Sequence, residues 1–327
     1  MNVPGFFVII LLVLSISVAA LSIFSAGDEN VIVTVVYTGE KEDFSFLDSS
    51  FRGLYRAQDE FGFDIREIHL LKEPDSDPVP DAGGVPSELV LILGGMMSRY
   101  AEEVQKQHPD ARLILIDAEP DINMDIRSIS FEMSGASYLA GILAAEQTQT
   151  GIIGVIGAED APVIHSYTDG FIAGVYQDRP DIRVLTSYLA DDAAGYAIPE
   201  KASLATLKMY EEGADLVFVV AGGSGIGAIR AAEELPGMHI IGVDTDQSFL
   251  SPDTVVASVV KNLDEIVYRE IADVFRGSYT PSAVRTGLEG GGASVVINPR
   301  FSSLAPLIEG RYDEAIAMEA GSSHDKQ

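Results

Sequence analysis

The stretch that decides the fold spans residues 213–261. It reads Gly213-Ala-Asp-Leu-Val-Phe-Val-Val-Ala-Gly-Gly-Ser-Gly-Ile-Gly227, then a helical segment, then His239-Ile-Ile-Gly-Val-Asp-Thr-Asp-Gln247 and Val255-Val-Ala-Ser-Val-Val-Lys261. Residues 216–220 form a continuous apolar run, which predicts a strand buried on both faces. Residues 226–235 predict a helix, and residues 239–243 predict the next strand. This strand–helix–strand order is typical of a parallel sheet.

Small and polar residues stand where these strands end. Gly222, Gly223 and Ser224 follow the first strand, and Asp244 follows the second. Ligands of open α/β sheets bind outside the carboxyl ends of the strands, and glycine lets a ligand approach the backbone closely. We therefore expect these residues to share one edge of a ligand site. Lys261 ends an otherwise apolar strand, where its charge needs a partner or a ligand.

The composition of the chain excludes several classes of function. Its 327 residues suffice for two domains. With 21 basic and 50 acidic residues the net charge is -29, which argues against binding to nucleic-acid phosphates. The chain has no cysteine, and its five histidines show no paired ligand spacing. We find no nucleophile elbow, Walker lysine or histidine cluster, so we expect no catalytic residue, no metal site and no cofactor.

The amino-terminal segment stands apart from the fold. Residues 5–24 carry no charge, and about 20 such residues can cross a bilayer. Residues 1–26 are therefore predicted to be a membrane anchor or a signal peptide, with Ser25-Ala26-Gly27 as a cleavage site in the second case. The long apolar run, which no Lys or Arg precedes, favours the anchor. Either way, we expect residues from 27 onward to lie outside the cytoplasm.

Strands and helices alternate along the rest of the chain, and the alternation starts again after residue 131. Residues 74–86 are rich in Pro, Asp and Gly and predict a loop. The predicted strands cover residues 30–37, 63–70, 89–93, 112–116, 126–131, 151–156, 182–188, 216–220, 239–243, 255–261 and 293–297. The predicted helices cover residues 48–61, 99–107, 135–148, 163–177, 199–212, 226–235 and 263–276.

This order predicts an α/β fold with two similar three-layer α/β/α domains, whose parallel sheets are joined by a multi-strand hinge. The first lobe comprises residues 27–131 and about 262–288. The second comprises residues 132–261 and about 289–319. Residues 320–327 are expected to form a disordered tail.

Several motifs occur in the order typical of one known family. The chain resembles the basic membrane protein family of extracytoplasmic solute-binding proteins, the purine nucleoside receptor A-like group, which has the periplasmic binding protein type I fold. The similar stretches are Ser45-Phe46 with Gly53-Leu54, Leu115-Ile-Asp117, Phe131-Glu132, Tyr138-Leu-Ala-Gly-Ile-Leu-Ala-Ala145, Gly151-Ile-Ile-Gly154, Gly213-Ala-Asp215, Ala221-Gly-Gly-Ser-Gly-Ile-Gly227, Gly242-Val-Asp-Thr-Asp-Gln247 and Ser258-Val-Val-Lys261.

The resemblance implies a ligand closed between two lobes by hinge motion, and it implies roles for single residues. Phe46 would stack on a base. Asp117 and Asp244 would accept hydrogen bonds from ribose hydroxyls. Lys261 would donate to the ribose or pair with Asp244. Tyr196 is the candidate for a second stacking aromatic.

The remaining implied contacts come from two loops. Asp43 and Ser45 belong to the loop that carries Phe46, while Gly222, Gly223 and Ser224 would present backbone and hydroxyl groups to the ligand. Leu47 stands where the family has Asn, so an amide that could bond the base is missing.

The resemblance implies that the chain captures a small ligand, a purine nucleoside above all, and delivers it to the permease of an ABC transporter. One alternative is a ligand-sensing ectodomain for a signalling partner. A weaker alternative is a nucleotide-cofactor-binding enzyme, because Gly223-x-Gly-x-x-Ala228 followed by Asp244 fits a dinucleotide fingerprint.

Overall fold

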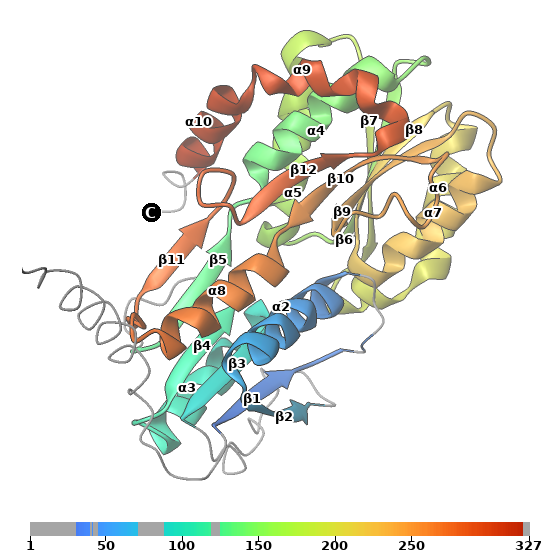
Figure 1. The fold of residues 1–327 in the computed structure, drawn as a ribbon. Coiled ribbons are helices and arrows are strands. Elements are labelled where there is room, and N and C mark those ends of the chain that lie inside the picture. The colour runs from blue at the N-terminus through green and yellow to red at the C-terminus, as the bar shows by residue number, and fades with distance from the viewer. Residues whose placement is uncertain (1–30, 40, 42–44, 71–87, 119–124, 323–327) are drawn as a thin grey trace, which may run out of the picture.

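The computed structural model describes residues 31–39, 41, 45–70, 88–118 and 125–322. Two six-stranded sheets with flanking helices form two lobes (Figure 1). The first sheet has the order β11 (Ala283–Thr286), β5 (Arg127–Phe131), β4 (Arg112–Ile116), β3 (Leu89–Leu93), β1 (Ile32–Tyr37), β2 (Asp64–His69). The second has the order β12 (Ala293–Ile297), β10 (Val255–Lys261), β9 (His239–Asp244), β8 (Leu216–Val220), β6 (Ile152–Glu159), β7 (Arg183–Ala190). The prediction of two similar α/β domains is confirmed.

The strands β1, β3 and β4 of the first sheet are buried on both faces. All strand pairs of this sheet are parallel, and successive side chains of each strand point to opposite faces. In β3, Leu91 belongs to the core under α2 (Phe46–Phe61) and α8 (Leu263–Phe275), whereas Ile92 belongs to the core under α3 (Ser98–Gln107). This is why a continuous apolar run marks a strand here.

Two helix pairs flank the second sheet: α4 (Ser134–Gln147) packs on α5 (Pro162–Asp178), and α6 (Pro199–Glu211) packs on α7 (Gly225–Glu233) (Figure 1). The sequence predicted one apolar face for α4. The structure buries every residue from 134 to 145, because α5 and the carboxyl-terminal helix cover α4 from outside while the sheet covers it from inside.

The chain crosses between the two sheets three times within the described residues: after β5, after β10 and after β11. Strand β12 pairs antiparallel with β10, and Ala293 lies opposite Lys261. It runs antiparallel because the chain re-enters the second lobe at the hinge, where β10 ends. The second sheet is therefore parallel except at this strand, and the lobe boundaries stay a prediction.

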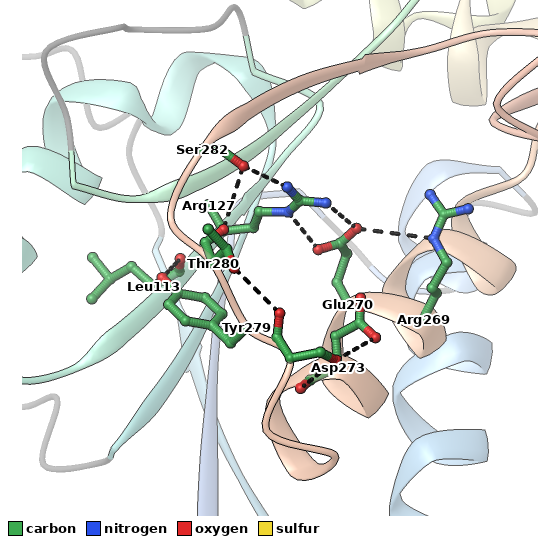
Figure 2. Close-up of polar contacts among 9 residues, drawn as sticks. Leu113, Arg127, Arg269, Glu270, Asp273, Tyr279, Thr280 and Ser282 are labelled. Atoms are coloured by element: carbon green, nitrogen blue, oxygen red, sulfur yellow. Dashed lines mark hydrogen bonds and ion pairs between the residues drawn. The ribbon is translucent and has the colours of Figure 1, made fainter.

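A buried ion pair holds helix α8 on the first lobe, and neighbouring contacts hold the segment that follows it (Figure 2). Arg127 of β5 donates two hydrogen bonds to Glu270 of α8, at 2.8 and 3.1 Å, and a third to Ser282 at 2.7 Å. Tyr279 donates to the carbonyl of Leu113 in β4 at 3.0 Å. The Glu270 residue is 2% exposed, so its charge depends on Arg127. These contacts attach α8 and the segment that leads into β11 to strands β4 and β5 of the first sheet.

Strand β6 is longer than predicted, and the difference matters for the site. The sequence placed its end before Gly157, whereas the structure continues it to Glu159. Gly157 does not turn the chain: a Cβ at this position would lie 2.7 Å from the Tyr188 ring and 2.8 Å from Ile164. The glycine serves close packing, and the strand carries a carboxylate to the edge of the sheet.

Helix α2 begins earlier than predicted. The predicted helix start at residue 48, with Asp48-Ser49-Ser50 expected as the cap, lies inside the helix, where Ser50 donates a hydrogen bond to the Phe46 carbonyl at 2.9 Å. Ser45 is the first flanking residue, and its hydroxyl makes no capping bond. The serines of this stretch are buried, which explains why the capping pattern misled the prediction.

The carboxyl-terminal elements were underpredicted. Strand β11 has four residues and a charged Arg285, so no apolar run marks it. Helices α9 (Ala305–Glu309) and α10 (Tyr312–Ser322) follow it, and α10 packs on α4. The predicted tail is therefore wrong for residues 320–322, while 323–327 lie outside the described residues.

Short 3-10 segments complete the fold; they are η1 (Gly95–Met97), η2 (Ala193–Ala197), η3 (Gly222–Ser224) and η4 (Pro299–Leu304). The predicted anchor or signal peptide (1–26) and the predicted loop (74–86) lie outside the described residues. Within the described ranges, no helix combines the length and the apolar character that a membrane span requires.

Candidate functional site

Two aspartates stand at strand ends that face each other across the lobes. Asp117 follows β4 in the first lobe, and Asp244 ends β9 in the second. Among the described residues other than glycine, only these two have a positive φ, 64° and 69°. Backbone in this region costs of order 1–3 kcal/mol and collects at functional sites. Each of these strands thus ends at or just before a carboxylate, and the ligand roles of the two aspartates stay a prediction.

Lys261 bridges the lobes to Asp117. Its ammonium donates to both carboxylate oxygens at 2.9 Å, and the two side chains are 5% and 19% exposed. The sequence left open whether this lysine would meet the ribose or Asp244; in the structure its partner is Asp117. A bidentate, nearly buried pair of this kind is held strongly because neither charge has ready access to water.

Asp244 receives its bonds from both lobes. The hydroxyl of Ser45, from the first lobe, donates to Oδ2 at 2.5 Å, and that of Tyr167, from α5, donates to Oδ1 at 3.4 Å. Burial raises the pKa of Tyr167, and the carboxylates of Asp244 and Asp117 raise it further. The phenol therefore stays neutral and acts as a donor. The sequence did not single out Tyr167, because it lies inside a helix rather than at a strand end.

Aromatic rings surround the Lys261 ammonium. Their centroids lie 5.8 Å away for Phe46, 5.2 Å for Phe131 and 5.9 Å for Tyr167. At these distances the ring faces attract the cation. Phe46 is half-buried, as a residue that can take up a flat ligand must be. Phe131 was quoted for its motif but not proposed as a site residue.

We call these six residues the interlobe site: Ser45, Phe46, Asp117, Tyr167, Asp244 and Lys261. Each lobe contributes donors and acceptors to it. A surface hollow of about 270 Å³ opens beside it, lined by Asp48 and Arg52 of α2 and by Thr245, Asp246 and Phe249 of the second lobe. Both lobes thus line one surface here as well.

Tyr196 borders the interlobe site from segment η2. Its ring packs on Gly222, whose φ is 50°, and a Cβ on Gly222 would lie 3.3 Å from that ring. A Cβ on Gly223 would lie 3.3 Å from the Tyr196 carbonyl. Burial raises the pKa of Tyr196 strongly, and the neighbouring carboxylate of Glu159 raises it further. The structure thus brings Tyr196, Gly222 and Gly223 together.

Ser224 has a different role from the one predicted. Its hydroxyl is buried, donates to the Gly195 carbonyl at 2.7 Å and accepts from the amide of Ile198 at 2.7 Å. It anchors η2 instead of facing a ligand. Gly227 also serves packing, since a Cβ there would lie 1.9 Å from the Pro199 carbonyl. This contact holds α6 against α7, and Gly227 is not one of the three positions of the dinucleotide fingerprint.

Two further predictions concern positions around the site. Asp43 lies outside the described residues. Leu47 is 4% exposed and packs in the first-lobe core, so it presents nothing to a ligand. In the part of the chain that the structure describes, no group of three or more potential metal-ligating side chains gathers.

Comparisons with known proteins agree with this arrangement. The family model described as ABC transporter substrate-binding protein PnrA-like matches residues 30–317. Basic membrane protein A of Borreliella burgdorferi is 29% identical over 319 residues, which cover 90% of this chain and 88% of that protein. Basic membrane protein A of Borreliella afzelii is 31% identical over 245 residues, 71% of each chain.

A solved structure is similar over the same range. The ABC transporter system solute-binding protein from Aeropyrum pernix K1 has 25% sequence identity and a TM-score of 0.73, covering 90% of this chain and 86% of that one. The likeness therefore includes both lobes. Because the family model matches most of its length, the chain belongs to the family of PnrA-like ABC transporter substrate-binding proteins.

Proposed function

We propose that this substrate-binding protein captures a purine nucleoside between its lobes and delivers it to the permease of an ABC transporter. The observation that carries the proposal is the pair of strained carboxylates, Asp117 and Asp244, which face each other from opposite lobes beside aromatic rings. A carboxylate accepts bonds from two adjacent hydroxyls well. Flat ring faces such as that of Phe46 suit a heterocycle. A nucleoside carries both features.

The bonds between the lobes suggest how a ligand is held. Lys261 donates a hydrogen bond to the carboxylate of Asp117, and Ser45 donates one to the carboxylate of Asp244. A ligand that bridges the lobes would exchange these bonds for its own, so that each lost bond is replaced. It would also shift the population toward the closed arrangement. No bond of the ligand is made or broken in this scheme, so the protein acts as a binding protein and not as an enzyme.

We place the lobes outside the cytoplasm, where substrate-binding proteins meet their ligands. Residues 1–26 would hold the chain at the membrane, or would be removed as a signal peptide. The permease would then recognise the closed form. Transport assays on membrane vesicles that hold the transporter, with and without this chain, separate delivery to a permease from the alternative role of a sensing ectodomain.

The ligand is tested by calorimetry on the purified chain with nucleosides, free bases, pentoses, hexoses and NAD. We expect at least one purine nucleoside to bind, and we expect Asp244→Ala and Phe46→Ala each to weaken that binding by at least about tenfold. The control is Asp253→Ala, because Asp253 is an exposed carboxylate that pairs with Arg300 and is not one of the interlobe-site residues. Binding of a sugar or of NAD alone would overturn the nucleoside assignment, as would variants that bind every nucleoside like the parent.

A further inference from the structure

Glu159 is a carboxylate that the roles given above do not use. It is the last residue of β6, at the carboxyl edge of the second sheet, and it is half-buried. Gly157 pairs with Val220 of β8, so the end of β6 runs beside the loop that begins at Gly222. Glu159 therefore lies on the same edge of the sheet as Gly222 and Asp244.

The neighbouring Tyr196 is held tightly against this edge. A Cβ on Gly195 would lie 1.9 Å from the Ala158 carbonyl, which means that η2 packs directly on the end of β6. The Ser224 hydroxyl ties the same segment to η3. The Tyr196 ring rests on Gly222, and its hydroxyl neighbours the Glu159 carboxylate. The pair is thus built into the fold from several sides.

The charge of Glu159 is not balanced. Glu159 makes no ion pair within the described residues, and its neighbour, the phenol of Tyr196, is neutral. A carboxylate has about four acceptor positions, and one phenol fills one of them. A half-buried carboxylate with spare acceptor positions favours further N–H or O–H donors.

We propose that Glu159, oriented by Tyr196, selects the base of the ligand by accepting two N–H groups from a guanine-type heterocycle. This inference rests on the proposed function and names the ligand more closely. Guanine presents N1–H and the 2-amino group side by side, which matches the two oxygens of one carboxylate. Hypoxanthine offers N1–H alone. Adenine places the acceptor N1 beside its amino group, and that lone pair faces a carboxylate unfavourably.

The same carboxylate makes the site a poor one for phosphorylated ligands. Three carboxylates, those of Asp117, Asp244 and Glu159, lie near Tyr196, and the ammonium of Lys261 is already paired with Asp117. A phosphate adds negative charge to a surplus of negative charge. We therefore expect the site to accept nucleosides and to reject nucleotides.

The experiment is calorimetry with guanosine, inosine, adenosine and guanosine monophosphate on the full chain and on Glu159→Gln, Tyr196→Phe and Asp160→Asn. The parent chain is expected to prefer guanosine to adenosine by at least about tenfold, because one bidentate pair discriminates by about that much. Glu159→Gln offers one donor and one acceptor, which complement adenine, so it should invert the preference. Tyr196→Phe should reduce the preference, and the exposed Asp160→Asn should leave it unchanged.

The outcomes separate this inference from the proposed function. If the parent binds nucleosides but Glu159→Gln keeps the same guanosine-to-adenosine ratio, the role of Glu159 is wrong and the proposed function stands. If the parent binds no nucleoside, the proposed function fails first. Because a merely structural role would lower all affinities together, inversion of the ratio is the result that supports selection by Glu159. Thermal melting of each variant confirms that it is folded, and Tyr196→Phe supplies a second measurement.

Discussion

At the scale of single residues, the site depends on two aspartates in a backbone conformation that most side chains avoid. The left-handed region costs roughly 1–2 kcal/mol for an ordinary residue, whereas Asp and Asn enter it more easily. Asp117 and Asp244 therefore serve twice: the side chain binds, and the residue type permits the turn that aims it across the lobes.

This double role can be separated by substitution. Asp244→Asn keeps the shape and the tolerance for a positive φ, so its free energy of unfolding should stay within about 1 kcal/mol of the parent. Asp244→Ala should cost about 1 kcal/mol more than Asp244→Asn, since it also loses that tolerance. Urea unfolding of the ligand-free chains measures both. Equal stability of the Ala and Asn variants would contradict the role of the backbone.

At the scale of elements, the last helix is attached to the hinge through a carboxyl group. Glu319 of α10 is buried and accepts hydrogen bonds from the amide of Leu288 at 3.0 and 3.2 Å. Burial raises its pKa to about 7, and the nearby Glu132 and Glu289 raise it while Arg285 and the Leu288 amide lower it. The folded state therefore holds the proton of Glu319 more tightly than the unfolded state does.

The sign of the resulting pH dependence follows from this preference. Between the ordinary pKa of 4.5 and the folded value of about 7, the folded chain binds more protons than the unfolded chain. Stability from this group is therefore full below about pH 4.5 and is lost as the pH rises through 7. We expect the melting temperature of the parent to fall across this window relative to that of Glu319→Gln, and to level off above it.

The control is Glu309→Gln on the neighbouring helix α9, because Glu309 is exposed. Each variant loses one carboxyl group and keeps all the other acidic groups of the chain. Melting curves from pH 4 to pH 8.5 measure the difference. A constant difference between parent and Glu319→Gln across the window would show that Glu319 does not titrate in it.

At the scale of the whole molecule, two contacts between the lobes are reciprocal: in Lys261–Asp117 the first lobe supplies the carboxylate, and in Ser45–Asp244 the second lobe does. The three chain crossings at the hinge join the lobes on one side. Single side chains that join the lobes can therefore shift the equilibrium between the open and closed arrangements.

Removal of one such bond should open the ligand-free molecule. Ser45→Ala deletes a donor to Asp244, so the radius of gyration from small-angle X-ray scattering should increase without ligand and return to the parent value with it. Ser50→Ala is the matched control, because Ser50 bonds within α2 only. A radius that is unchanged by Ser45→Ala would mean that this bond does not hold the lobes together.

The sequence alone determined the order of strands and helices and the position of the main site residues at strand ends. Both follow from local physics: a strand buried on both faces is a continuous apolar run, and the carboxyl ends of parallel strands meet at one edge. Asp244 and Lys261 were predicted in this way, whereas the resemblance to the family implied the role of Asp117. Strand β11 was missed because a short edge strand with a charged residue carries no such signal.

Only the tertiary structure decided which side chains meet. It paired Lys261 with Asp117, brought Tyr167 to Asp244, turned the Ser224 hydroxyl toward the main chain and extended β6 to Glu159. These contacts join residues distant in the sequence, and they depend on how closely two backbones approach at glycines such as Gly157 and Gly195. Local patterns report which residues are buried and where an element ends, but close approach between elements is a property of the packed molecule.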